Sequence, residues 1–299
     1  MKVCFVYSNR SEYSLLLPFI DYFNKKIPIK EINLKKSIKK IELDKNLPHI
    51  YSFCYNNFKK NNYDYICVLG DRRELPFIAL AALHLEKNLV HIAAGEYIEE
   101  IQTYDQYVRP IISILSKYQI CFSVKAKNEV KKLFKGISYL KPNTFVFGNP
   151  VFSGIDLDSL KRSIKENYDL VLMHPNSLSK EQTKKDMLEI KSKMKNKKTI
   201  IINGNKDANY DIIQNFYSEL KNKKKYVFFE SLPKKKYFSL VKYCDKFYTN
   251  SSSMTEIKFL NKNCLNQIGN RNKNRSESLL DKKSPEYLFK LLKKDNISK

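Results

Sequence analysis

The stretch YDYICVLGDRRELPFIALAALHLEKNLVHIAAGE, residues 63–96, decides the fold of this chain. It holds two apolar runs, YICVLG and NLVHIAAG, with the helix-like block LPFIALAALHLE between them. Apolar runs that do not alternate with polar residues indicate strands buried on both faces. A helix that joins two such strands is a crossover connection, so the two strands are expected to be parallel.

Charged residues follow both of these predicted strands. Asp71 and Arg72 come directly after the first run, and Glu96 follows the second. Parallel strands end at the same edge of a sheet, and open α/β sheets bind ligands outside that edge. We therefore expect Asp71, Arg72 and Glu96 to meet over one cleft, although charged residues also simply mark the start of surface loops.

Composition indicates a globular protein of more than one domain. The chain has 299 residues, of which 42% are hydrophobic and 13% aromatic. No apolar run approaches the length that spans a bilayer, so we predict no membrane association. The six cysteines are scattered without a C-x-x-C pair, which is typical of reduced core residues in a cytoplasmic protein rather than of metal ligands.

The chain is strongly basic, with 55 Lys and Arg against 31 Asp and Glu and a formal net charge of +24. Such an excess is compatible with nucleic-acid binding. Lysine is plentiful along the whole chain, however, and no basic block accompanies a nucleic-acid motif. We therefore predict no nucleic-acid partner, whereas a basic cleft for an anionic small molecule fits the same charge.

Strand and helix patterns alternate along nearly the whole chain. The first helix is expected behind a cap at Ser11, and a polar stretch after Pro150 interrupts the alternation before it restarts near residue 168. We predict two Rossmann-like α/β domains with the ligand between them. Their expected bounds are 1–152 for the first domain, 153–167 for the linker, 168–283 for the second domain and 284–299 for a C-terminal helix that packs back across the hinge.

Three loops of the second half carry candidate site residues, two of them suited to anion binding and one a histidine of the kind that is usually structural or solvated. Ser251 and Ser252 precede a predicted helix, where hydroxyls and free backbone N–H groups suit a phosphate, although ordinary N-capping by Ser252 or Ser253 explains the same pattern. His174 follows another strand, and Arg271 follows a glycine, where it can bind a phosphate or form a salt bridge.

The chain resembles the UDP-N-acetylglucosamine 2-epimerases over roughly residues 1–275, because a set of motifs occurs in the order found in that family. These motifs are NRSEYSLLLP, LGDRRE, HIAAGE, YDQYVRPIISILS, FGNP, MHP, GNKDA, TNSSSMTE and QIGNR. The form RSEY followed by Ser14 resembles the hydrolysing subgroup. The resemblance implies a GT-B arrangement, a homodimer or other homo-oligomer, and an enzyme of nonulosonic acid or surface polysaccharide synthesis without metal or redox cofactor.

The reaction that this resemblance implies is elimination of UDP across C1–C2 of a UDP-2-acetamido sugar, followed by addition of water at C1. The product is a free sugar of the N-acetylmannosamine type. Elimination needs a base near the C2 proton and stabilisation of the departing diphosphate. The catalytic residues implied by matching motifs are Asp71, Asp105, Arg109, His174 and Glu96, and those for binding UDP or sugar are Arg10, Ser14, Arg72, Asn205, Ser251, Ser252, Glu256 and Arg271.

Four features depart from the family pattern, one of which is that Glu256 lies one residue closer to the NSSS segment than expected. Ala93 stands where the family often has glutamate, the segment before Asp71 is short, and Lys234 stands where an aromatic residue is usual. Two other functions therefore stay open. One is a GT-B glycosyltransferase, which would need an acceptor site, and the other is a catalytically inactive sugar-nucleotide binder.

Overall fold

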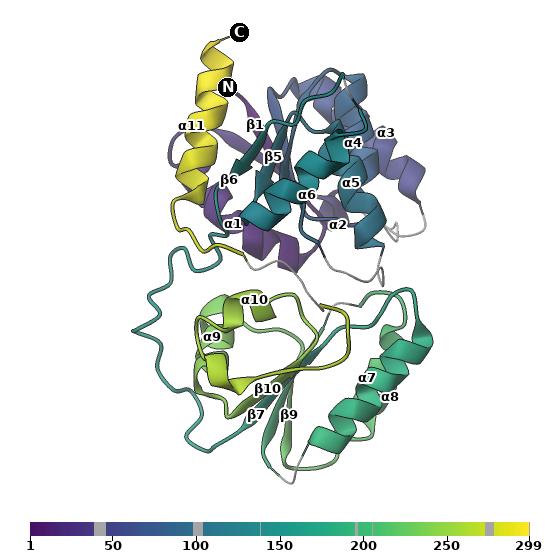
Figure 1. The fold of residues 1–299 in the computed structure, drawn as a ribbon, viewed down its shortest axis with the longest axis vertical. Helices are drawn as coiled ribbons and strands as arrows, with labels where there is room; N and C mark the ends of the chain where they lie inside the picture. The colour runs from purple at the N-terminus through teal and green to yellow at the C-terminus, as the bar shows by residue number, and fades with distance from the viewer. Residues whose placement is uncertain are drawn as a thin grey trace. The chain divides into compact units, whose positions relative to one another are not determined.

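The computed structural model describes residues 1–38, 46–97, 104–137, 139–194, 197–204, 206–272 and 278–298. The chain forms two compact units, of which unit 1 comprises Met1–Tyr97, Tyr104–Gly154 and Ser278–Lys299, and unit 2 contains Ile155–Glu277. Each unit has its own parallel sheet (Figure 1). The prediction of two Rossmann-like α/β domains is thereby confirmed.

The sheet of unit 1 has six strands in the described chain, and every neighbouring pair is parallel. Their order is β2 (Ile29–Asn33), β1 (Val3–Tyr7), β3 (Tyr65–Leu69), β4 (Asn88–Ile92), β5 (Tyr118–Cys121) and β6 (Thr144–Val146). The two strands predicted from the opening stretch are the adjacent pair β3 and β4, in which Leu69 lies opposite Ile92. Both therefore end at the same edge of the sheet.

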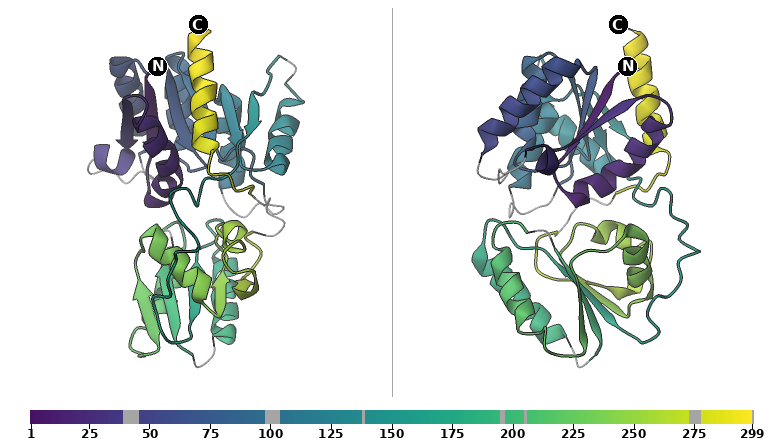
Figure 2. Two further views of the ribbon diagram at one scale, coloured as in Figure 1. Left: turned by 90° about the vertical axis from the view of Figure 1, so that its left-hand side faces the viewer. Right: turned by 180° about the vertical axis from the view of Figure 1, so that it is seen from behind.

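Helices cover both faces of this sheet, as the views in Figure 2 show. They are α1 (Arg10–Asn24), α2 (Leu34–Ser37), α3 (Leu47–Asn61), α4 (Leu75–His84), α5 (Asp105–Leu115), α6 (Val124–Phe134) and α11 (Ser284–Ile297). On one face α1 and α11 pack together over residues such as Phe5 and Val90. On the other face α3, α4 and α5 bury Cys4, Ile66 and Leu89.

The first helix begins earlier than the sequence prediction placed it. Its N-cap is Asn9, not Ser11, and the Asn9 side chain accepts a hydrogen bond from the Glu12 backbone N–H. Glu12 in return accepts from the Asn9 N–H, which completes a capping box. Asn9 followed three residues later by a glutamate is the sequence signature of this cap, and it outweighs the serine at position 11.

Unit 2 repeats the architecture with a five-stranded parallel sheet among its described residues. The strand order is β11 (Leu265–Gln267), β10 (Lys246–Thr249), β7 (Asp169–Met173), β8 (Thr199–Asn203) and β9 (Tyr226–Phe229). The helical segments are α7 (Lys180–Lys193), α8 (Tyr210–Ser218), α9 (Lys234–Tyr243), α10 (Met254–Ile257) and the 3-10 helix η1 (Lys262–Cys264). Helices α7 and α8 cover one face of the sheet and α9 covers the other.

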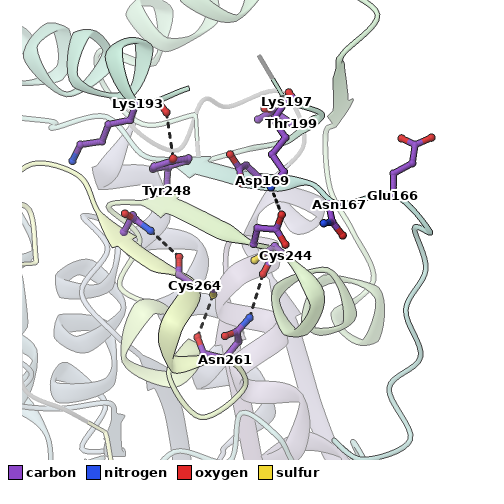
Figure 3. A network of polar contacts seen from close by, with 12 residues as sticks. Glu166, Asn167, Asp169, Lys193, Lys197, Thr199, Cys244, Tyr248, Asn261 and Cys264 are labelled. Carbon is purple, nitrogen blue, oxygen red and sulfur yellow. Dashed lines mark hydrogen bonds and ion pairs between the residues drawn. The ribbon is translucent and has the colours of Figure 1, made fainter. Parts of the chain in front are cut away.

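Polar contacts tie together the amino-terminal edge of this second sheet (Figure 3). Asn261 donates to the Cys244 carbonyl oxygen at 3.2 Å, and the Cys264 thiol donates to the Asn261 carbonyl oxygen at 3.1 Å. The Tyr248 hydroxyl donates to the Lys193 carbonyl oxygen at 3.3 Å. The two cysteines thus belong to the packing of this edge, which lies at the opposite end of the strands from His174 and Asn250.

Candidate active-site residues

The carboxyl edge of the unit 1 sheet begins at Gly70, where β3 ends. Gly70 has φ +83°, a left-handed conformation that glycine adopts without strain. Its N–H donates to the Ile92 carbonyl oxygen at 3.0 Å, so the ends of β3 and β4 are joined just before Asp71. The sequence-based expectation that both strand ends share one edge is confirmed.

Arg109 connects the side chain that follows β3 with the loop that follows β4. Its guanidinium forms an ion pair with the Asp71 carboxylate and also donates to the Glu96 carbonyl oxygen. Only 5% of Arg109 is exposed, whereas the Asp71 side chain is 20% exposed. The structure therefore brings Asp71, Arg109 and the Glu96 backbone together, with the carboxylate on the more accessible side.

Asp105 is the first residue of α5 and lies one turn before Arg109 on the same helix. Its residue is partly exposed, and the helix begins there without a side-chain cap. A carboxylate in the first turn of a helix is favoured by the helix dipole. Asp105 and Arg109 thus lie four residues apart on one helix, and Arg109 contacts the carboxyl edge through Asp71 and Glu96.

The remaining predicted residues of unit 1 lie on two neighbouring elements. Arg10 is the exposed first residue of α1, and Ser14 is half-buried on the following turn. The Arg72 Nε donates to the Glu74 carboxylate at 3.0 Å, and Glu74 is fully buried. Arg72 therefore neutralises a buried acid of its own loop, in addition to any contact with a substrate.

Two residues of the HIAAGE segment have left-handed backbone conformations. Gly95 has φ +71°, and a Cβ there would lie 2.1 Å from the Ala126 carbonyl oxygen of α6. Only glycine fits this close approach. Ala93 has φ +61°, which is uncommon for a residue with a side chain and is typical of strain at functional loops.

Sequence reasoning missed the environment of Glu12. One of its carboxylate oxygens, Oε2, accepts from the Ser8 N–H and hydroxyl at 2.8 Å each. The other, Oε1, is buried and has no hydrogen-bond partner among the described residues. Burial, and then the neighbouring Glu74 charge, raises the pKa of Glu12 to about 7.

This raised pKa predicts a pH-dependent effect of Glu12→Gln on stability. A carboxyl group whose pKa is higher in the folded than in the unfolded protein stabilises the fold only while protonated, so its contribution is lost as pH rises from about 4.5 through 7. Glutamine stays neutral and its carbonyl can accept the same Ser8 hydrogen bonds. We expect the stability of Glu12→Gln relative to the unsubstituted protein to rise by roughly 3 kcal/mol between pH 4.5 and pH 8, as measured by urea denaturation.

The matched control for this experiment is Glu219→Gln, which alters an exposed carboxylate at the end of α8. It makes the same chemical change at an exposed position, so its pH dependence is the background that is subtracted from that of Glu12→Gln. If the free energy of unfolding of Glu12→Gln and of the unsubstituted protein changes with pH in parallel, Glu12 ionises in the folded protein as readily as in the unfolded one.

The carboxyl edge of the unit 2 sheet centres on Asn250, which follows β10 and is fully buried. Its side-chain oxygen accepts from the His174 N–H at 2.8 Å, and its side-chain nitrogen donates to the His174 carbonyl oxygen at 2.8 Å. Its own carbonyl oxygen accepts from Arg271 at 3.3 Å and from Asn272. Asn250 therefore fixes the two strand-end residues predicted for this unit, His174 and Arg271, relative to each other.

His174 is uncharged in this environment. Burial, and then the positive charge of Arg271, lowers the pKa of its imidazole to about 3. A neutral imidazole has one N–H donor and one acceptor nitrogen for hydrogen bonds, whereas an imidazolium can only donate. This protonation state is compatible with the role predicted for His174.

The serine loop after Asn250 lacks the side-chain N-capping that the sequence offers as one of its two explanations. Helix α10 is only four residues long, its N-cap is Ser253, and that cap makes no side-chain hydrogen bond. Ser251 instead accepts from the Ser253 N–H at 3.3 Å and shares a 3.0 Å hydroxyl contact with it. Ser251 is buried and Ser252 is partly exposed, so Ser252 is the more accessible hydroxyl.

Two further predicted residues belong to this unit. Glu256 lies in α10 and is largely buried. Burial lowers the pKa of Lys234 to about 8, and the negative charge of Glu256 partly opposes this shift. Asn205 lies outside the described residues.

Gly269, next to the Arg271 loop, packs so closely on Asp186 that an added Cβ would lie 2.2 Å from the Asp186 Oδ1.

Within the described ranges, no group of three or more His, Cys, Asp and Glu side chains is arranged to hold a metal ion. In the same ranges, none of the helices is both long and apolar enough to cross a membrane. All six cysteines are buried and free of disulfides.

Solved structures with this fold are known. The UDP-GlcNAc 2-epimerase of Methanocaldococcus jannaschii, solved in complex with UDP-GlcNAc and UDP, has a TM-score of 0.73 and 17% sequence identity, over 98% of this chain and 99% of that one. At this identity the likeness shows the fold, which is GT-B-like in these epimerases and was predicted from the motifs.

Curated relatives also resemble the chain. The polysialic acid biosynthesis protein P7 of Escherichia coli is 29% identical over 243 residues, 76% of this chain and 61% of that protein. The hydrolysing GDP/UDP-N,N'-diacetylbacillosamine 2-epimerase of Campylobacter jejuni is 29% identical over 275 residues, 86% of this chain and 69% of that enzyme. The chain thus spans about three fifths of the length of the first relative and about two thirds of the second.

The family profile described as UDP-N-acetylglucosamine 2-epimerase matches residues 17–281. That match includes Asp71, Arg109, His174 and the Asn250 loop, whose geometry is described above. The resemblance inferred from the ordered motifs is confirmed, and this chain belongs to the UDP-N-acetylglucosamine 2-epimerase family.

Proposed function

We propose that this protein is a hydrolysing 2-epimerase that acts on UDP-N-acetylglucosamine or a related UDP-2-acetamido sugar and releases UDP with a free sugar of the N-acetylmannosamine type. The observation that carries the proposal is the Asp71–Arg109 pair at the carboxyl edge of unit 1, with Asp105 on the same helix as Arg109. Family membership and the hydrolysing Campylobacter relative support it.

In this proposal a carboxylate removes the proton from C2 of the sugar while the C1–O bond breaks and its electron pair leaves with UDP. The glycal that results takes up water, with the oxygen added at C1 and a proton returned to C2 on the opposite face. Asp71 and Asp105 are the proton-transferring groups, and Arg109 holds the Asp71 carboxylate in one orientation. The Glu96 carbonyl oxygen accepts from Arg109 and helps to hold its guanidinium, and the Glu96 carboxylate is proposed as a further catalytic group.

Cations and hydroxyls are assigned to the diphosphate, whose negative charge grows as it departs. These residues are Arg10 and Arg72 in unit 1, and Ser251, Ser252 and Arg271 in unit 2. His174 is assigned to the departing group as a neutral hydrogen-bonding residue. Glu256 is proposed for the ribose hydroxyls, and Ser14 and Asn205 for the sugar.

The product distinguishes this function from its alternatives. The protein is incubated with UDP-GlcNAc, and free UDP and free sugar are measured together; both should form in equal amounts. Formation of the epimeric UDP-sugar without free UDP would contradict hydrolysis. Transfer to an added glycan would indicate a glycosyltransferase, and UDP binding without turnover would indicate the inactive binder that Ala93 suggests.

Three other expectations stay predictions. A homodimer or other homo-oligomer is predicted from the resemblance alone. A cytoplasmic location is predicted from the cysteines, which are free and buried and so fit a reducing compartment. Synthesis of nonulosonic acids or surface polysaccharide is the proposed context, and the E. coli relative named for polysialic acid biosynthesis supports it.

A further inference from the structure

His91, the histidine of the HIAAGE segment, is completely buried at the end of β4 and makes two side-chain hydrogen bonds. Its Nε2 lies 2.7 Å from the Gly70 carbonyl oxygen. Its Nδ1 lies 2.9 Å from the Ser113 hydroxyl oxygen on α5. One imidazole thus joins the ends of β3 and β4 to the helix that carries Asp105 and Arg109.

The chemistry of the two partners fixes the tautomer. A carbonyl oxygen can only accept a hydrogen bond, so Nε2 must carry the proton that bonds to Gly70. Burial lowers the pKa of His91 to about 4, so the ring is neutral at pH 7 and Nδ1 is an acceptor. The Ser113 hydroxyl therefore donates to Nδ1, and both ring nitrogens are satisfied.

The Gly70 carbonyl belongs to the peptide bond that leads into Asp71. The N–H of Gly70 is already bonded to Ile92, the residue after His91. Both backbone polar groups of Gly70 are therefore bonded to consecutive residues of β4. With φ +83° and no side chain, Gly70 has little intrinsic preference for one conformation, so these two bonds set the direction in which the chain enters Asp71.

We propose that His91 is a positioning residue, which holds the Gly70–Asp71 peptide and α5 in register so that the Asp71 carboxylate meets Arg109 in its reactive orientation. This inference rests on the proposed function, in which Asp71 transfers a proton. His91 itself contacts no reacting atom and acts only through Gly70 and Ser113. An error of about 1 Å in the position of a catalytic group can cost about a hundredfold in rate.

Two substitutions separate the two hydrogen bonds of His91. Glutamine is long enough to place its side-chain N–H near the position of Nε2, so His91→Gln can keep the bond to Gly70. Asparagine is shorter and can accept from Ser113 but cannot reach Gly70. We expect His91→Asn to lower kcat about 10- to 100-fold with KM for UDP-GlcNAc within about twofold, and His91→Gln to stay within about fivefold of the unsubstituted kcat.

Ser116→Ala is the matched control for general damage to this helix end. It removes a buried hydroxyl that donates to the Ile112 carbonyl oxygen at 2.7 Å, without touching His91. Rates are expressed per folded molecule, with the folded fraction taken from circular dichroism. A purely structural role for His91 predicts that all three variants keep the unsubstituted kcat per folded molecule.

Amide hydrogen exchange tests the same geometry without turnover. In His91→Asn the peptide that contains Gly70 to Arg73 should exchange at least about tenfold faster, while His91→Gln and Ser116→Ala leave its rate unchanged. If His91→Asn exchanges faster than the unsubstituted protein in this peptide, but the unsubstituted protein releases no UDP, the proposed function is refuted and the positioning of the peptide stands. His91→Asn with unchanged exchange and unchanged kcat would overturn the positioning role.

Discussion

Asp71→Asn is expected to lower the turnover of UDP-GlcNAc by about two to four orders of magnitude, the usual loss when a general acid–base group is removed. Asparagine has nearly the same shape as aspartate and can still accept a hydrogen bond from Arg109, but it cannot take up a proton from the sugar. UDP affinity should stay close to that of the unsubstituted protein, because Asp71 is assigned to the sugar. The measurements are initial rates of UDP release and calorimetric titration with UDP.

Asp64→Asn provides the control, because Asp64 lies just before β3, at the opposite end of the same strand, and pairs with the chain N-terminus. It should keep full turnover. In heavy water the unsubstituted enzyme should also place deuterium at C2 of the free sugar, because the C2 proton is lost and regained. An Asp71→Asn protein with turnover within threefold of the unsubstituted enzyme would remove Asp71 from the proton transfer.

Asn250→Asp is expected to destabilise the protein by about 2–4 kcal/mol at pH 7. The substitution keeps the oxygen that accepts from the His174 N–H, but it replaces the donating nitrogen by a second oxygen. That oxygen would face the His174 carbonyl oxygen and the Asp186 carboxylate in a fully buried place. A buried acceptor that faces other acceptors loses its hydrogen bond and adds repulsion. Urea denaturation of both proteins measures the cost.

A protonated aspartic acid can donate where asparagine does, so the cost of Asn250→Asp should shrink as pH falls toward 4. Asn270→Asp, an exposed position on the loop after β11, is the matched control and should change stability by less than about 0.5 kcal/mol. Equal stability of Asn250→Asp and the unsubstituted protein at pH 7 would mean that the polar cluster of unit 2 rearranges freely.

Sequence reasoning was sufficient for the parts of the site that follow from strand order. Asp71 and Glu96 follow two parallel strands that end together, and Arg109 on the next helix contacts the Asp71 carboxylate and the Glu96 backbone. The periodicity of the apolar residues determines all of this, since each run is long enough to mark its element.

The hydrogen-bond partners could not be predicted in the same way. Asn250 and His174 are 76 residues apart, and His91 and Ser113 are 22 apart, so their contacts depend on how separate elements pack. Before the fold is known, many polar side chains compete for each such partner. The cap of α1 is the exception, because Asn9 and Glu12 are neighbours in sequence and their spacing alone would have identified it.

The buried cysteines allow the unfolding of each unit to be measured separately. Cys4, Cys54, Cys67 and Cys121 lie in unit 1, and Cys244 and Cys264 lie in unit 2. Burial raises the pKa of Cys54 and of Cys121 to about 12, so these thiols are unreactive as well as inaccessible until the surrounding structure opens. When a thiol reagent is added in enough excess that labelling outpaces reclosing, it should label each unit at the rate at which that unit opens. Peptide mapping of the label would then give two opening rates from one sample without any engineered probe.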